Sequence, residues 1–231
     1  MNGRWGLWFA GIFVIALLAL LPIRLAIAGI ADAGFTARQA AGTIWYGRIG
    51  ELMVKGRRLG TFEAAVDPFS LVAGTARIRF SRMDDPQGIL TGTLLSGTAD
   101  GVEGLNGRIG GNGLFGAIPL EAIDAKDLDV RFKGGRCAKA GGRLKAILAT
   151  PIPGLGSTEL AGTPRCEGER VRFNLTAPSG QGGLEFYVTA QGRYRAWLRI
   201  VGVAPDTGAA LAAAGFRQGA EGLVMSAEGH W

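Results

Sequence analysis

The fold is decided by the stretch LEFYVTAQGRYRAWLRI, residues 184–200. Hydrophobic side chains alternate with polar or charged ones on both sides of Gln191-Gly192. A period of two places one set of side chains on a buried face and the other in water. A short break that contains glycine is typical of a tight turn between two strands. The stretch therefore predicts an antiparallel hairpin of residues 184–190 and 193–200.

The same period recurs elsewhere past residue 40, which predicts further strands of one antiparallel sheet. The apolar positions of these stretches are Ile78 and Phe80; Leu128, Val130 and Phe132; and Val171, Phe173 and Leu175. A last strand is expected through Leu223, Val224 and Met225, after the helix near the C-terminus. The breaks between the stretches contain Gly, Asn, Asp or Pro, as turns require. One helix interrupts the sheet: Pro205-Asp206-Thr207 opens a helix over Gly208 to Ala214, and Gly215 ends it.

The composition indicates a folded chain with many turns. Of 231 residues 39 are glycine, yet 48% are apolar, which is enough to fill a core. The net charge is +6, but the 25 basic residues are scattered, and the densest group is only Lys55-Gly56-Arg57-Arg58. We therefore predict no nucleic-acid partner, and a solvated basic surface instead. The fold class is mainly β: a twisted, largely antiparallel, glycine-rich sheet with one short helix near the C-terminus.

The N-terminus carries an apolar segment that predicts a transmembrane helix. Residues 5–23 hold nineteen residues without a charge. At about 1.5 Å per residue such a helix spans roughly 28 Å, close to the hydrocarbon thickness of a bilayer. Trp5 and Trp8 stand at one end, where indole rings favour the headgroup zone. We expect residues 1–4 in the cytoplasm, residues 5–23 as a signal anchor, residues 24–40 as a linker and residues 41–231 as a β-rich domain in the periplasm.

A cleaved signal peptide is the alternative for this segment. Ala26-Ile27-Ala28 resembles the small-x-small site of signal peptidase. Arg24 interrupts the approach to that site, and the apolar stretch exceeds the usual length of a signal peptide. These two features favour an uncleaved anchor, and both alternatives export the rest of the chain.

Cys137 and Cys166 are the only cysteines. A metal site needs more ligands, and the sole histidine is His230, so we predict no metal. Two reduced, buried thiols are one alternative. A disulfide is favoured in an exported domain, and closing a loop of about 30 residues would contribute about 3.5 kcal/mol.

The patterns that suggest catalysis or cofactor binding have simpler explanations. Residues 111–116 match G-x-G-x-x-G, but Pro119 follows and no helical period begins, so we expect a glycine-rich turn and no cofactor. His230 is penultimate and expected to fray. The carboxylates Asp84 and Asp85, and Asp127 and Asp129, lie beside turns or on a wet face, whereas acid–base work needs a desolvated partner. We predict no catalytic residues and no enzyme.

The segment Ala41-Gly42-Thr43-Ile44-Trp45-Tyr46-Gly47-Arg48 resembles the entry motif of the type II secretion system protein N family. That motif is a small residue, Gly-Thr, an aliphatic residue, Trp, any residue and Gly, shortly after an N-terminal anchor. Residues 66–71, Val-Asp-Pro-Phe-Ser-Leu, look like the family's proline–leucine segment. The tryptophan expected just before that proline is missing, and Ala64-Ala65-Val66 stands there instead.

The later part of the chain is similar to the family as well. It has two spaced cysteines, Gly192-Arg193-Tyr194 opening a strand, an Ala-Leu helix ending at Gly215 and a closing glycine-rich strand. The resemblance implies an accessory inner-membrane subunit of the type II secretion system that contacts other inner-membrane subunits and has no cofactor. Such a subunit takes part in the export of folded proteins across the outer membrane.

Two questions stay open from the sequence. Trp45 is either packed in the core or a contact for a partner, since Trp is over-represented at interface hot spots. The function has an alternative too: a membrane-anchored periplasmic β-sheet that curls into an apolar trough could bind or transfer lipid. Alternation alone does not distinguish a trough from a filled core.

Overall fold

The computed structural model of the chain describes residues 8–9, 11–13, 16–17, 19–24, 35–54, 57–82, 88–152 and 155–230. The strands are β1 Phe35–Gly42, β2 Gly47–Val54, β3 Arg57–Val66, β4 Thr75–Arg82, β5 Leu90–Gly97, β6 Ala99–Gly110, β7 Leu120–Lys133, β8 Arg136–Leu148, β9 Glu159–Gly162, β10 Pro164–Glu167, β11 Arg170–Thr176, β12 Gly182–Thr189, β13 Arg193–Ile200, β14 Arg217–Gly219 and β15 Gly222–His230. The labelled helices are α3 Pro68–Val72 and α4 Pro205–Ala213.

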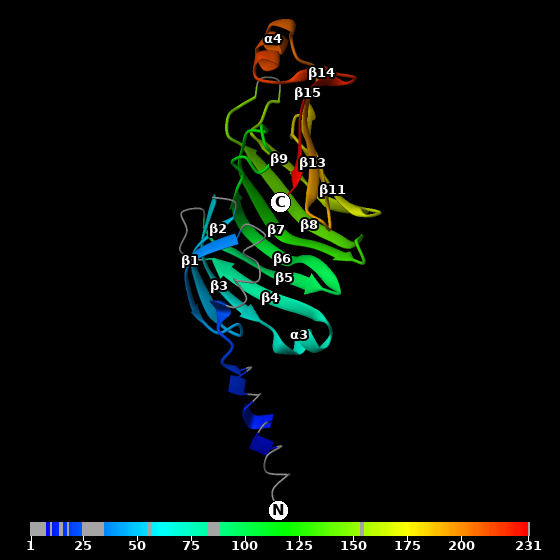
Figure 1. Ribbon diagram of the computed structural model, residues 1–231. Helices are drawn as coiled ribbons and strands as arrows, with labels where there is room; N and C mark the ends of the chain where they lie inside the picture. The colour runs from blue at the N-terminus through cyan, green and yellow to red at the C-terminus, as the bar shows by residue number, and fades with distance from the viewer. Residues whose placement is uncertain are drawn as a thin grey trace, which may run out of the picture.

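Within the described ranges these strands form one sheet. The order is β1 through β9, then β11, β12, β13, β15 and β14, and β10 pairs with β11 outside this order. Every pairing is antiparallel. Figure 1 shows a twisted, bent sheet with β1 to β3 on one side of β4 to β8 and β11 to β15 on the other. The predicted fold class, a mainly β chain with an antiparallel sheet, is confirmed.

The hairpin predicted from residues 184–200 is β12 and β13. Leu184 lies opposite Leu198 and Phe186 opposite Ala196, and all four side chains are buried. Their neighbours along each strand face the other side and are partly or fully exposed. The inner side chains of this hairpin join those of β7, β8, β9 and β11 in one hydrophobic cluster. The alternation therefore marks the two faces of the sheet correctly.

The glycine-rich stretch of residues 111–116 is a turn between β6 and β7, as predicted. Phe115 is fully buried, with its ring centroid 4.7 Å from that of Phe186 and 5.2 Å from that of Tyr194. Ile118 is buried beside it in the same cluster. The turn thus covers the inner face of the C-terminal strands with apolar side chains.

The C-terminal region follows the prediction with one correction. α4 has Pro205 at its start and Asp206 in its first turn, both favourable at a helix N-terminus, and Leu211 is its buried residue. The chain then returns through β15, as expected. His230 was expected to fray, but it ends β15 opposite Arg193 because the backbone ladder with β13 continues to that point.

The N-terminal segment stands apart from the sheet. Among the residues that the structure describes, no helix is both long and apolar enough to cross a membrane. Every described residue from Trp8 to Leu20 is exposed. β1 begins at Phe35, so residues 35–40 of the expected linker form a strand, because they pair with β2.

Candidate interaction surface

The loop between β1 and β2 is fastened to the end of the N-terminal segment. The backbone N–H of Ile44 donates to the carbonyl of Leu21 at 2.9 Å, and the N–H of Val66 donates to the carbonyl of Ile44 at 3.0 Å. Ile23 is buried beside Gly47, where an added Cβ would lie 2.5 Å from the Ile23 Cδ1 atom. Gly47 is therefore needed for this close approach.

Trp45 and Tyr46 lie at the tip of this fastened loop. Trp45 is half-buried, and Tyr46 is exposed. The backbone N–H of Thr43 donates to the carbonyl of Tyr46, which closes the loop. Trp45 is not among the residues of the central hydrophobic cluster. The partner contact predicted for Trp45 stays a prediction.

β1 stands at one end of the strand order, and β14 at the other. β14 has three residues, whereas β1 has eight. Within the described part of the sheet, β1 pairs with β2. Beside it, a hollow of about 570 Å³ is lined by side chains or backbone of Arg38, Gln39, Ala41, Arg48, Gly50, Glu51 and Thr61. Arg38 Nη1 and Glu51 Oε2 form an ion pair of 3.0 Å at its border. This corner combines a long edge strand with a polar hollow.

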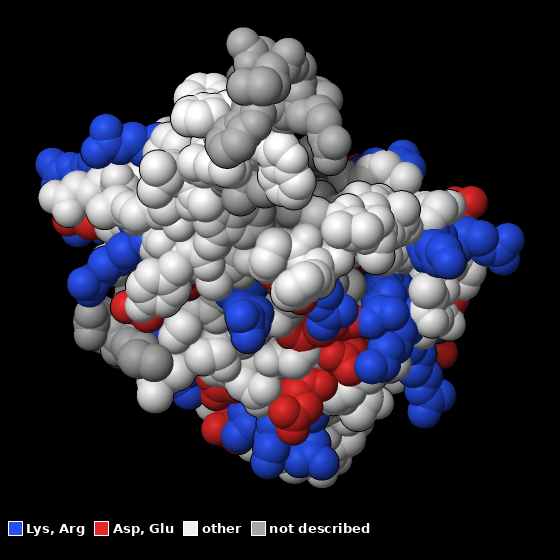
Figure 2. Space-filling view, turned by 90° about the horizontal axis from the view of Figure 1, so that it is seen from below, with Lys and Arg blue, Asp and Glu red and all other residues white. Residues whose placement is uncertain are grey.

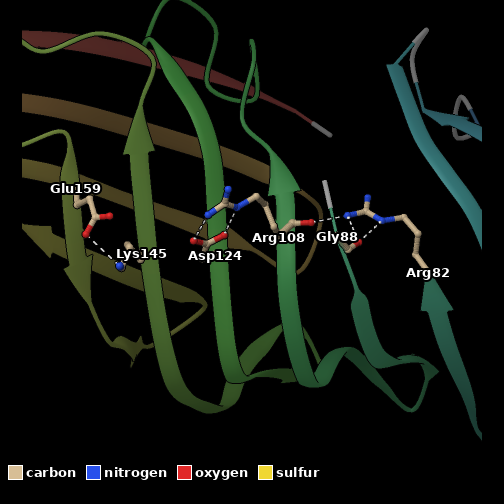
Figure 3. A network of polar contacts seen from close by, with 6 residues as sticks. All are labelled: Arg82, Gly88, Arg108, Asp124, Lys145 and Glu159. Carbon is tan, nitrogen blue, oxygen red and sulfur yellow. Dashed lines mark hydrogen bonds and ion pairs between the residues drawn. The ribbon is translucent and has the colours of Figure 1, made fainter. Parts of the chain in front are cut away.

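A row of polar contacts crosses the middle of the sheet, strand by strand (Figure 3). Arg108 of β6 holds Asp124 of β7 through two hydrogen bonds of 2.6 and 2.8 Å. Lys145 of β8 pairs with Glu159 of β9 at 3.0 Å. At the other end of the row, Arg82 of β4 donates to main-chain carbonyls instead of a carboxylate. The pairs of Arg108 with Asp124 and of Lys145 with Glu159 each join two neighbouring strands, whereas the buried Arg82 links β4 to β3 and β6.

Two carboxylates of the sheet, Asp124 and Asp129, have lowered pKa values. The hydrogen bond from Arg108 lowers the pKa of Asp124 below its ordinary value. The ammonium of Lys139 and then the backbone N–H of Gly104 lower the pKa of Asp129. A general acid at neutral pH needs a raised pKa, so these carboxylates are suited to ion pairing. Asp84 and Asp85 lie outside the described residues.

Several arginines of the C-terminal strands form ion pairs with glutamates. Hydrogen bonds to Glu185 and then Glu167 raise the pKa of Arg172. Arg195 pairs with Glu228, and Arg199 pairs with Glu221. Glu167, Glu185 and Glu228 come from strands next to those of their arginines, and Glu221 comes from the turn before β15. The pairing of the strands brings these glutamates into reach.

The two cysteines form a disulfide, as predicted. Cys137 of β8 and Cys166 of β10 have Cα atoms 5.4 Å apart. The backbone N–H of Cys137 also donates to the carbonyl of Gly168, next to β10. The bond ties the middle of the sheet to its C-terminal strands. Within the described ranges, no cysteine is free.

The sequence did not predict two features of this surface. α3 presents apolar side chains to solvent, whereas apolar residues were assigned to the core. Arg82 is 1% exposed, although its sequence neighbours gave no sign of burial. The only signal was its place in the alternation of β4, on the same face as Ile78 and Phe80.

Comparison with known proteins identifies the family. The family model described as type II secretion system (T2SS), protein N, matches residues 33–225, which include every strand from β2 to β14. No curated protein and no solved structure matches the chain. The match covers most of the chain, including the loop with Trp45, the disulfide and the C-terminal hairpin. The chain belongs to the type II secretion system protein N family.

Proposed function

We propose that this protein is an accessory subunit of the type II secretion system in the inner membrane, anchored by residues 5–23. Residues 41–231 lie in the periplasm and act through protein contacts, without catalysis. The observation that carries the contact role is the eight-residue edge strand β1 beside the fastened loop with Trp45. The family membership supplies the secretion system as the setting.

Two observations support the membrane and the compartment. The described side chains from Trp8 to Leu20 are exposed, so this apolar segment has its surface available for lipid. The disulfide between Cys137 and Cys166 suits an oxidising compartment such as the periplasm.

The edge of β1 supports contact by strand addition. An edge strand presents backbone N–H and C=O groups that another extended segment is able to pair with. Thr36 and Arg38 are exposed on this strand. Arg24 Nε donates to the carbonyl of Ala40 at 3.2 Å, near the end where the N-terminal segment meets the sheet. Because the loop with Trp45 directly follows β1, a partner subunit that adds a strand to β1 would lie beside Trp45.

The inner face of the sheet is packed with side chains, which favours the protein-contact role over lipid transfer. An acyl chain needs an apolar-lined space, but Leu160, Leu175 and Leu198 of the inner face are fully buried among protein side chains. Phe115 fills the space next to them. The lipid alternative therefore finds less support than a scaffold with a filled core.

Photo-cross-linking in cells tests the proposal. A photoreactive amino acid replaces Thr36 in β1 or Trp45, and Gln218 in the short edge strand β14 is the matched control. We expect adducts with membrane subunits of the secretion system from positions 36 and 45, and few from 218. Adducts with lipid alone from both positions would count against the protein-contact role. Native mass spectrometry of gently extracted protein then shows whether phospholipid co-purifies.

A further inference from the structure

The apolar side chains of α3 are exposed to solvent, whereas a helix that packs on a core buries such side chains. Phe69 and Val72 are 84% and 90% exposed, and Leu71 is 43% exposed. The residue that faces the protein is Ser70, whose side chain is buried. An amphipathic helix of a soluble domain normally buries the apolar face and exposes the polar one. α3 therefore carries an apolar surface that has no cover within the described residues.

Specific hydrogen bonds hold α3 in this orientation. The hydroxyl of Ser70 donates to the carbonyl of Asp67 at 2.6 Å and accepts from the backbone N–H of Arg77 at 3.0 Å. The carboxylate of Asp67 accepts from the N–H of Phe69 at 3.0 Å and caps the helix. The N–H of Asp67 donates to the carbonyl of Arg77 in β4. The outward direction of the apolar residues is thus built into the fold.

α3 is coupled to the N-terminal apolar segment through a short chain of backbone contacts. Leu21 accepts from Ile44, and Ile44 accepts from Val66, which is two residues before α3 begins. Tyr46, in the same loop as Ile44, is 67% exposed. Figure 1 shows α3 at the end of the molecule from which the N-terminal residues extend.

The surrounding surface suits a bilayer with anionic lipid. Figure 2 looks at this end of the molecule and shows a broad uncharged area bordered by Lys and Arg side chains, with Asp and Glu side chains among them on one side. Basic groups beside an inserted apolar surface are attracted to anionic headgroups. Arg24 is exposed directly after the N-terminal segment.

We infer that Phe69, Leu71 and Val72 of α3, together with Tyr46, form a second membrane contact in the headgroup region of the bilayer. This inference rests on the proposed anchoring by residues 5–23. The occupant is the phospholipid surface because α3 lies at the end of the molecule from which the N-terminal segment extends and exposes its apolar side chains there. With two points of attachment, the sheet keeps one orientation to the membrane, and β1 faces its partners at a defined height.

Fluorescence of the full chain in vesicles tests this contact. The native cysteines form a disulfide, so a cysteine introduced by Val72→Cys is the thiol available for an environment-sensitive dye. The vesicles contain phosphatidylethanolamine and phosphatidylglycerol, with a nitroxide either near the headgroup or deep in the acyl chains. Ile12→Cys reports on the anchor, and Gln218→Cys on β14 is the control. The dyes attached at these three positions are called dye 72, dye 12 and dye 218. We expect headgroup nitroxide to quench dye 72, deep nitroxide to quench dye 12, and aqueous iodide to quench dye 218.

The outcomes separate the contact from the anchor. Iodide quenching of dye 72 while dye 12 stays in the bilayer would overturn the contact and leave the proposed function intact. Iodide quenching of both dyes would overturn the contact and the anchoring together. Shielding of dye 72 in membranes that contain the other secretion subunits, but not in lipid vesicles, would assign α3 to a protein partner and overturn the lipid contact.

A charge variant gives a second, independent measurement. Phe69→Asp in the Val72→Cys background places a carboxylate on the exposed side of α3, where it does not disturb the core. We expect iodide quenching of dye 72 to rise severalfold while dye 12 is unchanged. The matched control is Thr36→Asp, an exposed position in β1, which leaves dye 72 as in the parent. Equal iodide quenching of dye 72 in the Phe69→Asp variant and its parent would contradict the contact.

Discussion

The guanidinium of Arg82 in β4 donates to the main-chain carbonyl of Arg108 in β6 at 2.7 Å, across the end of the intervening strand β5. The same side chain donates to the carbonyl of Leu59 in β3 at 2.9 Å and to that of Gly88 before β5. One buried side chain thus satisfies backbone groups from three segments that are far apart in the sequence. Figure 3 shows its contacts with Gly88 and Arg108. Arg82 therefore links β4 to β3, to β6 and to the segment before β5.

We expect Arg82→Met to lower the free energy of unfolding by about 2–3 kcal/mol, because it leaves buried carbonyls without a charged donor. Urea unfolding followed by far-UV circular dichroism measures the change. Arg82→Lys is the matched control: it keeps the charge but has a single donor group, so we expect an intermediate loss. A Met variant as stable as the parent would show that these carbonyls need no donor.

Removal of the disulfide by Cys137→Ala and Cys166→Ala should lower the free energy of unfolding by about 3.5 kcal/mol. The reason is that the bond closes a loop with a sequence separation of 29 in the unfolded chain. Urea unfolding with and without reductant measures it. Reductant should destabilise the parent and leave the double variant unchanged. An equal response of the two proteins would refute a structural role for the bond.

The ion pair of Arg108 and Asp124 predicts a pH-dependent contribution to stability. The pKa of Asp124 is lowered in the folded state, so its contribution is fully present above the ordinary carboxyl value of about 3.9. It is lost as the pH falls through the lowered value. Arg108→Gln should cost about 0.2–1 kcal/mol at neutral pH, and the difference from the parent should vanish in acid. Urea unfolding at a series of pH values measures both.

The matched control for this pair is Arg199→Gln, which removes an ion pair with the largely exposed Glu221. We expect a smaller loss of stability there, because the carboxylate of Glu221 is more accessible to water than that of Asp124. A constant difference between the Arg108→Gln variant and the parent at all pH values would contradict an electrostatic origin.

Substitution of Gly47 should detach the end of the N-terminal segment. Gly47→Ala brings a Cβ to 2.5 Å from Ile23 Cδ1 and to 2.8 Å from the backbone carbonyl oxygen of Thr43. Overpacking of this kind costs about 1–3 kcal/mol, so trypsin should cleave after Arg24 roughly tenfold faster than in the parent. Gly50→Ala is the control, because its Cβ would meet Gln39 at 3.2 Å and a small shift relieves the contact. Equal cleavage rates of Gly47→Ala and the parent would show that Ile23 is not held there.

The elements that the sequence predicted well are those with unbroken alternation. β12 and β13 keep a regular register, so each apolar residue falls on the inner face. β6 was not predicted, because it is rich in glycine and its register against β7 shifts between Val102 and Leu105 and again by Gly107. Such bulges move side chains to the other face and interrupt the period of two.

The candidate contact surface was predicted in part. The loop with Trp45 was recognised from its motif, but its fastening to Leu21 and Val66 depends on backbone contacts between distant residues. α3 was not recognised, because apolar residues are assigned to the core by default. Only the hydrogen bonds of Ser70 show that the helix is turned the other way.

By itself the sequence determined that this protein is a mainly β chain with an apolar N-terminal segment and a pair of cysteines able to cross-link. It did so because alternation, hydropathy and residue type are local properties of the chain. Only the tertiary structure decided that Arg82 is buried, that several C-terminal arginines form ion pairs with glutamates and that α3 points outward. These outcomes depend on which strands lie side by side, and that arrangement is set by long-range pairing that no local pattern records.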